Sequence, residues 1–188
     1  MIARDRAWAL LTEFTKSESL RKHALAVEAS MRAYAERYAA DAEAWGVAGM
    51  LHDFDYEMHP TAPRHPAKGA EILVSRGVPG DVVYAILAHA DYSGYPRRSQ
   101  LDRALYGCDE LSGFVTACAL VRPGRAIAGL DAASVRKKLK DKGFARTVNR
   151  DDITGGAELL GLDLDEHIAA VIEALKPVAG DLGIAGTA

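Results

Sequence analysis

The sequence has little cysteine, no long apolar run and almost no net charge. Its two cysteines, Cys108 and Cys118, stand ten residues apart, which excludes a CxxC zinc pair or a disulfide framework and favours a reducing, cytoplasmic setting. No run of 18 apolar residues occurs, and residues 1–16 lack the apolar block of a signal peptide, so no membrane partner is expected. The formal charge of −3 argues against a polybasic or nucleic-acid-binding protein.

Alternating β patterns, internal repeats, low-complexity tracts and a G-x-S-x-G nucleophile motif are absent as well. The composition, with 49% hydrophobic and 26% charged residues over 188 positions, is ordinary for a globular chain that can bury a core. What is present is helical periodicity, and it predicts an all-α fold. The predicted helices lie near residues 4–15, 17–39, 42–53, 63–77 (entered through Pro66), 80–90, 101–121, 131–142, 151–161 and 163–182.

The stretch AGMLHDFDYEMHP ends an apolar helix on two adjacent polar side chains, His52 and Asp53. A buried carboxylate without a partner is costly, so Asp53 is expected either to be paired or to bind a cation. His23, His89 and Asp109 also fall on apolar faces of predicted helices. Each of them alone has an ordinary explanation as a hydrogen-bonded core residue. Together they leave several desolvated groups that one shared divalent cation would satisfy.

In chain order, His23, the adjacent His52-Asp53 pair and Asp109 resemble the ligand set of the HD superfamily of metal-dependent phosphohydrolases. That family is all-helical and is named for the His-Asp pair. The resemblance covers residues 18–121. It implies that these four residues bind the metal and that Asp53 is the catalytic residue.

Two further segments resemble those of HDIG and HD-GYP proteins. HPAKGAEIL begins at His65, and ILAHADYSGYP contains His89. Carried over, His65 and His89 hold a second ion that Asp53 bridges. The sequence departs from the HDIG motif because Phe-Asp follows the His-Asp pair, and from HD-GYP proteins because Ala90 replaces a second histidine. A cyclic-dinucleotide phosphodiesterase is therefore not expected, and the resemblance is to short, stand-alone bacterial HD hydrolases.

The ligand types limit the cofactor to one or two divalent ions. Imidazole and carboxylate groups suit manganese, iron, cobalt, nickel, zinc or magnesium. Such an ion lowers the pKa of a bound water from about 15.7 toward about 7, and the resulting hydroxide can attack phosphorus. We therefore expect a phosphohydrolase that acts on a small phosphorylated molecule such as a nucleotide. The expected organisation is one HD-type domain over 1–188, with its metal-binding core at about 18–121 and a helical extension at about 125–188.

Two alternatives remain open from the sequence. Some HD-fold proteins with a six-ligand set are di-iron oxygenases, and others are non-catalytic binding or signalling modules in which the metal is structural. His59, in a Pro-rich loop, and His167, in an amphipathic helix, lack the ligand pattern and are interpreted as structural or surface residues.

Basic residues near the expected site are candidates for holding a phosphate. Lys68, Arg64 and Arg97 are predicted to bind substrate, although each could also be a solvated surface charge. A second group is the segment 134–150, which carries seven Lys or Arg residues against Asp141 alone. The sequence is compatible with a lid over an anionic substrate, a nucleic-acid contact or a solvated helix face, the last being the ordinary explanation.

Overall fold

The computed structural model describes residues 2–186 and confirms the all-α prediction. Within that range the backbone forms ten α-helices and two 3-10 turns, and its only β pairing is an isolated bridge between Ala126 and Ala185. The helices are α1 (Arg4–Phe14), α2 (Glu18–Arg37), α3 (Ala42–Leu51), α4 (Ala67–Ser75), α5 (Gly80–Ala88), α6 (Gln100–Leu120), α7 (Ala132–Leu139), α8 (Arg150–Leu160), α9 (Leu164–Leu175) and α10 (Ala179–Leu182).

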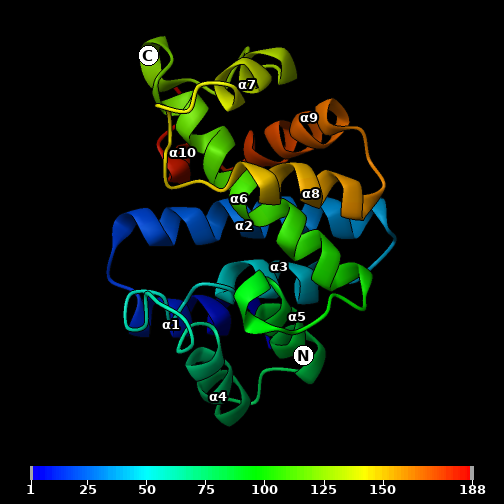
Figure 1. The fold of residues 1–188 in the computed structure, drawn as a ribbon. Coiled ribbons are helices and arrows are strands. Elements are labelled where there is room, and N and C mark those ends of the chain that lie inside the picture. Colours follow the sequence, from blue (N-terminus) through cyan, green and yellow to red (C-terminus); the bar gives the residue numbers. More distant parts are fainter. Residues whose placement is uncertain (1, 187–188) are drawn as a thin grey trace.

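Helix α2 crosses the middle of the molecule. Figure 1 shows α1, α3, α4 and α5 on one side of it and α7, α9 and α10 on the other. Helix α2 packs against α3 and α6. The α2–α3 crossing is close, because a Cβ atom at Gly49 would lie 2.8 Å from the Val27 carbonyl oxygen. This close approach brings the first turns of α2 beside the end of α3.

Side-chain caps determine where the three helices that approach the site begin. The Ser17 hydroxyl accepts a hydrogen bond from the Leu20 amide at the start of α2, and Asp41 caps α3 in the same manner. Helix α6 begins with a capping box formed by Ser99 and Asp102. Because capping satisfies backbone amides that have no partner within the helix, these helix starts are stabilised locally.

One predicted helix is wrong, and proline explains the difference. The single helix predicted over 163–182 is two helices, α9 and α10, because Pro177 has no amide hydrogen and cannot continue α9. The helix predicted to be entered through Pro66 is confirmed as α4, which begins at Ala67 directly after that proline. Residues 54–66 form turns that lead toward α4.

The C-terminal helices are packed onto the core by close contacts. A Cβ atom at Gly156 on α8 would lie 2.7 Å from the Cα of Gly107, so α8 and α6 cross nearly in backbone contact. On α9, His167 is buried, with Nδ1 2.5 Å from the Tyr34 hydroxyl oxygen and Nε2 2.9 Å from the Gly107 carbonyl oxygen. Both ring nitrogens of His167 are therefore occupied by protein partners.

Across residues 2–186, no helix combines the length and the apolar character that crossing a membrane requires.

Candidate metal centre

Six side chains from distant parts of the sequence converge beside the N-terminal half of α2. They form two groups, and in each group the potential ligand atoms all lie within 4.8 Å of one another. The first group is His23, His52 and Asp109, and the second is Asp53, His65 and His89. These are the six residues that the sequence analysis named as metal ligands.

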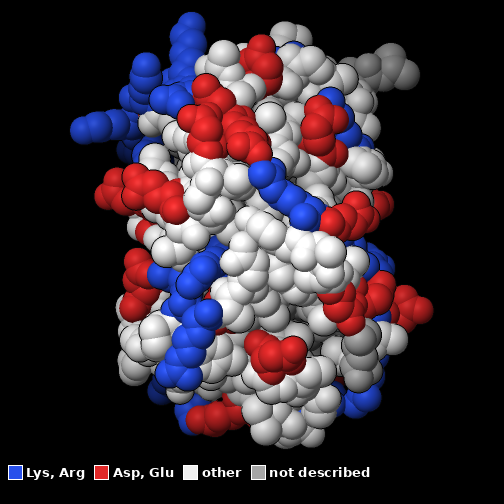
Figure 2. All heavy atoms as spheres, turned by 90° about the vertical axis from the view of Figure 1, so that its right-hand side faces the viewer, with Lys and Arg blue, Asp and Glu red and all other residues white. Residues whose placement is uncertain are grey.

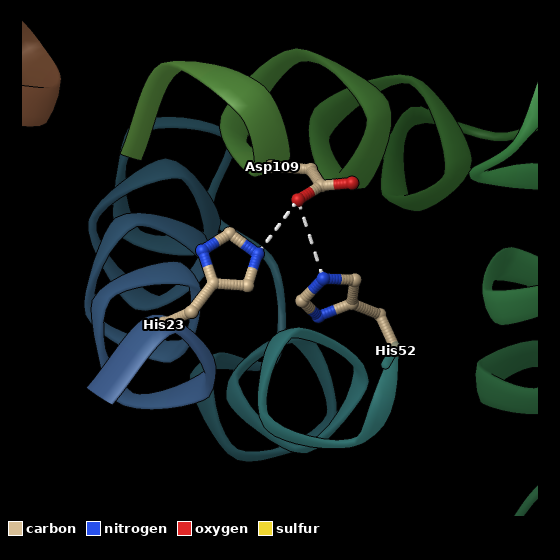
Figure 3. Close-up of side chains that lie close together, drawn as sticks. All are labelled: His23, His52 and Asp109. Atoms are coloured by element: carbon tan, nitrogen blue, oxygen red, sulfur yellow. Dashed lines mark hydrogen bonds and ion pairs between the residues drawn. The ribbon is translucent and has the colours of Figure 1, made fainter. Parts of the chain in front are cut away.

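The first group joins three helices. Figure 3 shows His23 from α2, His52 from the end of α3 and Asp109 from α6 pointing toward one another. The Asp109 Oδ1 atom lies 2.9 Å from His23 Nε2 and 3.2 Å from His52 Nε2. One carboxylate oxygen thus faces two imidazole nitrogens. A divalent ion coordinated by these three side chains could take the place of the contacts between them.

The second group surrounds the Asp53 carboxylate. Asp53 Oδ1 lies 3.1 Å from His65 Nε2 and 3.5 Å from His89 Nε2, and the two histidine nitrogens are 3.4 Å apart. Asp53 Oδ2 lies 3.6 Å from His52 Nε2 in the first group. The two oxygens of Asp53 therefore face different groups, and both His65 and His89 point inward rather than to solvent.

Three of the four histidines are oriented by a hydrogen bond from Nδ1. Because a carbonyl or carboxylate oxygen only accepts, Nδ1 carries the hydrogen and the neutral ring keeps its lone pair on Nε2, toward the centre. The acceptors are the Gly49 carbonyl for His52 at 2.7 Å, the Ile86 carbonyl for His89 at 2.6 Å and Asp55 Oδ1 for His65 at 2.8 Å.

The surroundings of the buried His52 side chain fit a bound metal ion. His52 is fully buried, and its Nε2 atom has no hydrogen-bond partner of good geometry among the described residues. A buried nitrogen without a partner is costly unless it has another role. With its lone pair directed at Asp53 and Asp109, His52 is a suitable ligand for a divalent cation, and the donor set of imidazoles and carboxylates fits the metals expected from the sequence.

Asp55 is a site residue that the sequence analysis did not identify. It is buried, and besides accepting from His65 it accepts a hydrogen bond from the Gly69 amide at 3.0 Å. A Cβ atom at Gly69 would lie 2.5 Å from the Asp55 Cγ atom, so only glycine leaves room for this carboxylate. The signal for it in the sequence is a second acidic residue two positions after Asp53.

The pKa values of two histidines at the site are raised, and those of two carboxylates are lowered. Burial alone would lower the pKa of His52, but the Asp53 and Asp109 carboxylates outweigh it and raise the pKa to about 10. Burial likewise opposes hydrogen bonds to Asp53 and Asp55, which raise the pKa of His65 to about 9. Burial alone would raise the pKa values of Asp53 and Asp109, but the neighbouring histidines hold both well below the usual range. Without a metal, protons on His52 and His65 thus balance the carboxylates.

A cavity of about 440 Å³ opens from the two groups. Beyond the candidate ligands its wall carries the carboxylates of Asp91, Glu110 and Asp152, and burial raises the pKa of Glu110 to about 7. No Lys or Arg side chain lines the cavity in the part of the chain that the structure describes.

The three basic residues predicted to bind substrate lie outside the cavity lining. Lys68 is exposed and paired with Glu71 at 2.8 Å, and Arg64 is exposed. The Arg97 guanidinium carbon lies 3.5 Å from the centre of the Tyr106 ring, behind the cavity wall. The structure therefore leaves these three cations outside the cavity lining, although Arg97 contacts the backbone carbonyl of His89.

The basic segment 134–150 begins on α7 and is also separate from most of the cavity. Figure 2 shows Lys and Arg side chains grouped at the top of the molecule, where Figure 1 places α7. Arg136 pairs with Asp165 at 3.2 Å, and the Lys138 Nζ atom lies 4.7 Å from the centre of the Phe144 ring. Of the described residues in the segment, only Asn149 lines the cavity.

The fold and the site together define an all-helical protein with a candidate centre for divalent metal ions. A family model described as HD domain matches residues 20–113, half of the chain, and this span contains all six candidate ligands. The chain therefore belongs to the HD-domain family, which confirms the resemblance. HD domains bind divalent metals and are generally metal-dependent hydrolases. No curated protein and no solved structure matched the chain.

Proposed function

We propose that this chain is a metal-dependent phosphohydrolase that uses water to cleave a small phosphorylated molecule. His23, His52, Asp53, His65, His89 and Asp109 are proposed to hold one or two divalent ions. One observation carries the proposal: the consecutive residues His52 and Asp53 belong to two neighbouring groups, and Asp53 presents one oxygen to each. A carboxylate in that position suits two ions that share it.

A bound divalent ion supplies a Lewis acid that polarises a phosphoryl oxygen and lowers the pKa of water. The chain's own residues prepare the site for it. The Gly49 and Ile86 carbonyls and Asp55 orient three imidazole rings, and Asp53 and Asp109 concentrate negative charge between those rings. In the proposed reaction the oxygen of water bonds to phosphorus, the phosphorus–oxygen bond to the alcohol breaks, and a proton from water ends on the released alcohol.

The first test is metal content and phosphate release. Protein purified without chelator should contain a divalent metal and release phosphate from a panel of phosphate esters. Asp53→Ala should lose most of the metal and essentially all turnover, because it removes the carboxylate that faces both groups. Circular dichroism should remain near that of the wild type, and the metal-dependent part of the melting temperature should disappear.

His59→Ala is the matched control, since His59 lies in the same loop region as His65 but outside the cavity lining. It should retain metal and activity. Full metal content and turnover in Asp53→Ala would refute the assignment of Asp53.

The same experiment separates the two alternatives. An oxygenase would contain iron and would consume oxygen during turnover, whereas phosphate release by the hydrolase should be equal with and without oxygen. A binding module with a structural metal would retain the ion and hydrolyse no ester in the panel.

A further inference from the structure

The cavity wall beyond the candidate ligands is rich in hydrogen-bond acceptors and contains no basic side chain among the described residues. Neither Glu110 nor Asp152 forms an ion pair in residues 2–186, and Asp91 is paired with Arg97 at 2.5 Å. One or two divalent ions would offset Asp53 and Asp109. The carboxylates of Glu110 and Asp152 would still face whatever part of the substrate lies away from the reacting phosphate.

Asp152 is held in place by Tyr106, which is itself supported by Arg97. The Tyr106 hydroxyl donates a hydrogen bond to Asp152 Oδ1 at 3.0 Å, and the Asn149 side chain also bonds to this carboxylate. Because the two oxygens of a carboxylate can accept about four hydrogen bonds, Asp152 can still accept from a ligand. The Tyr106 ring lies against the Arg97 guanidinium, and Arg97 also donates to the His89 carbonyl at 3.3 Å. A carboxylate supported in this way is an ordered acceptor rather than a mobile surface charge.

The position of Asp152 in the chain is informative as well. It lies on α8, outside the segment 20–113 that matches the HD family model. The close contact of Gly107 with Gly156 brings α8 against α6, which carries Asp109 and Glu110. Asp152 is therefore contributed to the cavity wall by a helix outside the matched HD-domain segment, whereas Asp91 and Glu110 lie inside it.

We propose that the cavity selects phosphate monoesters whose alcohol portion carries hydrogen-bond donors, either hydroxyl or ammonium groups, and that Asp152 accepts hydrogen bonds from that portion. This inference rests on the proposed phosphohydrolase function. Buried or half-buried acceptors that meet no donor lose their hydration without compensation, so an ester without donors is disfavoured. A second phosphate group would meet carboxylates where it needs cations, so diphosphates are excluded by repulsion.

Matched alkyl phosphates test the substrate class with the metal-loaded enzyme. Esters of equal chain length that end in a methyl, a hydroxyl or an ammonium group differ only in the proposed contact. For chains long enough to span the cavity, kcat/KM should be about 10- to 100-fold higher for the hydroxyl or ammonium ester than for the methyl ester. Of the hydroxyl and ammonium esters, the one with the larger increase in kcat/KM over the methyl ester carries the donor that the cavity prefers. A nucleoside monophosphate should likewise be cleaved in preference to the corresponding diphosphate.

Asp152→Asn should lower the preference for the ammonium ester over the methyl ester about tenfold or more, since it removes the charge while keeping the shape. Asp151→Asn is the matched control, because Asp151 lies on the same first turn of α8 but outside the cavity, and its preference should equal that of the wild type. Tyr106→Phe, which releases Asp152 from its support, provides a second variant should Asp152→Asn fold poorly, and should lower the same preference.

The outcomes distinguish the two proposals. Equal cleavage of all three alkyl phosphates, better cleavage of a diphosphate than of a monophosphate, or an unchanged preference in both the Asp152 and Tyr106 variants would overturn this inference and leave the phosphohydrolase intact. Failure of the metal-loaded enzyme to cleave any ester would overturn the proposed function, and this inference with it.

Discussion

At the scale of single residues, the site depends on side chains that need not touch a metal themselves. Asp55 orients His65 through Nδ1 and is itself held by the Gly69 amide. Residues of this kind keep the ligand ring in the correct tautomer and orientation, and their loss typically weakens metal binding about 10- to 100-fold. Asp55 is therefore a positioning residue for the second candidate group.

Replacing Asp55 with asparagine tests this role. The amide keeps one acceptor oxygen, but its nitrogen cannot accept, so either His65 Nδ1 or the Gly69 amide loses its partner. Asp55→Asn should weaken metal binding by about 10- to 100-fold and should destabilise the fold by about 1–3 kcal/mol. A competition titration with a metal-binding dye and a thermal melt measure the two effects.

Glu71→Gln is the control for that experiment, because Glu71 is an exposed carboxylate on α4 that pairs with Lys68 and lies outside the cavity lining. It should leave metal affinity and stability nearly unchanged. Wild-type metal affinity in Asp55→Asn would show that His65 is oriented without Asp55 or is not a ligand.

At the scale of helices, the crossing of α6 and α8 brings Asp152 to the cavity wall that Glu110 also lines. Gly156→Ala would place a Cβ atom 2.7 Å from the Gly107 Cα. Since the Gly107 Cα atom belongs to the backbone of α6 and cannot rotate away, the helices would have to move apart, at a cost of about 1–3 kcal/mol. The melting temperature should fall, and kcat/KM for the preferred substrate should fall with it because Asp152 moves with α8.

Gly155→Ala is the neighbouring control. Its Cβ atom would meet the Tyr106 hydroxyl at 3.6 Å, an ordinary contact, and alanine favours the helix over glycine by up to about 1 kcal/mol. This variant should be as stable as the wild type or more stable. If both alanine variants melt alike, the close crossing is not the feature that holds α8.

The structure favours the explanation that the basic residues of α7 form a solvated helix face. Lys137, Lys138 and Lys140 lie outside the cavity lining. Changing all three to glutamine should leave KM for a phosphorylated substrate, and its dependence on salt, unchanged, and should alter stability little because exposed charges contribute little.

Steady-state kinetics at two salt concentrations check this prediction. A large rise in KM that disappears at high salt would support the lid instead. A gel shift at low salt that the triple variant loses would support a nucleic-acid contact.

At the scale of the whole molecule, stability should depend on pH in opposite ways with and without metal. In metal-free protein, the raised pKa values of His52 and His65 stabilise the fold fully below their ordinary value of 6.5, and this contribution is lost as pH rises through about 9 to 10. The lowered pKa values of Asp53 and Asp109 stabilise the fold above 3.8, and this contribution is lost as pH falls.

A metal ion and a proton compete for the same histidine nitrogens, so metal binding should release protons and strengthen as pH rises. The increase in melting temperature that the metal causes should therefore grow between about pH 6 and pH 9. Thermal melts with and without chelator across this range measure it, with Asp53→Ala as the variant that should show no increase. A chelator effect that is the same at every pH would contradict the competition.

The sequence by itself determined the helical class and the set of candidate ligands. Helical periodicity and apolar faces follow from local chain geometry, so the helices were predicted closely, except where Pro177 divides the last predicted helix into α9 and α10. His52 and Asp53 could be found because an apolar helix that ends on adjacent polar side chains implies a partner for them.

Only the tertiary structure decided which residues meet. It divided the six candidate ligands into two groups, placed Asp55 behind His65, and left Lys68 and Arg64 in solvent. It also brought Asp152 from α8 to the cavity wall. The physical reason is that these contacts join residues far apart in the chain, whose positions depend on helix crossings such as Gly107 with Gly156, and no local pattern encodes those crossings.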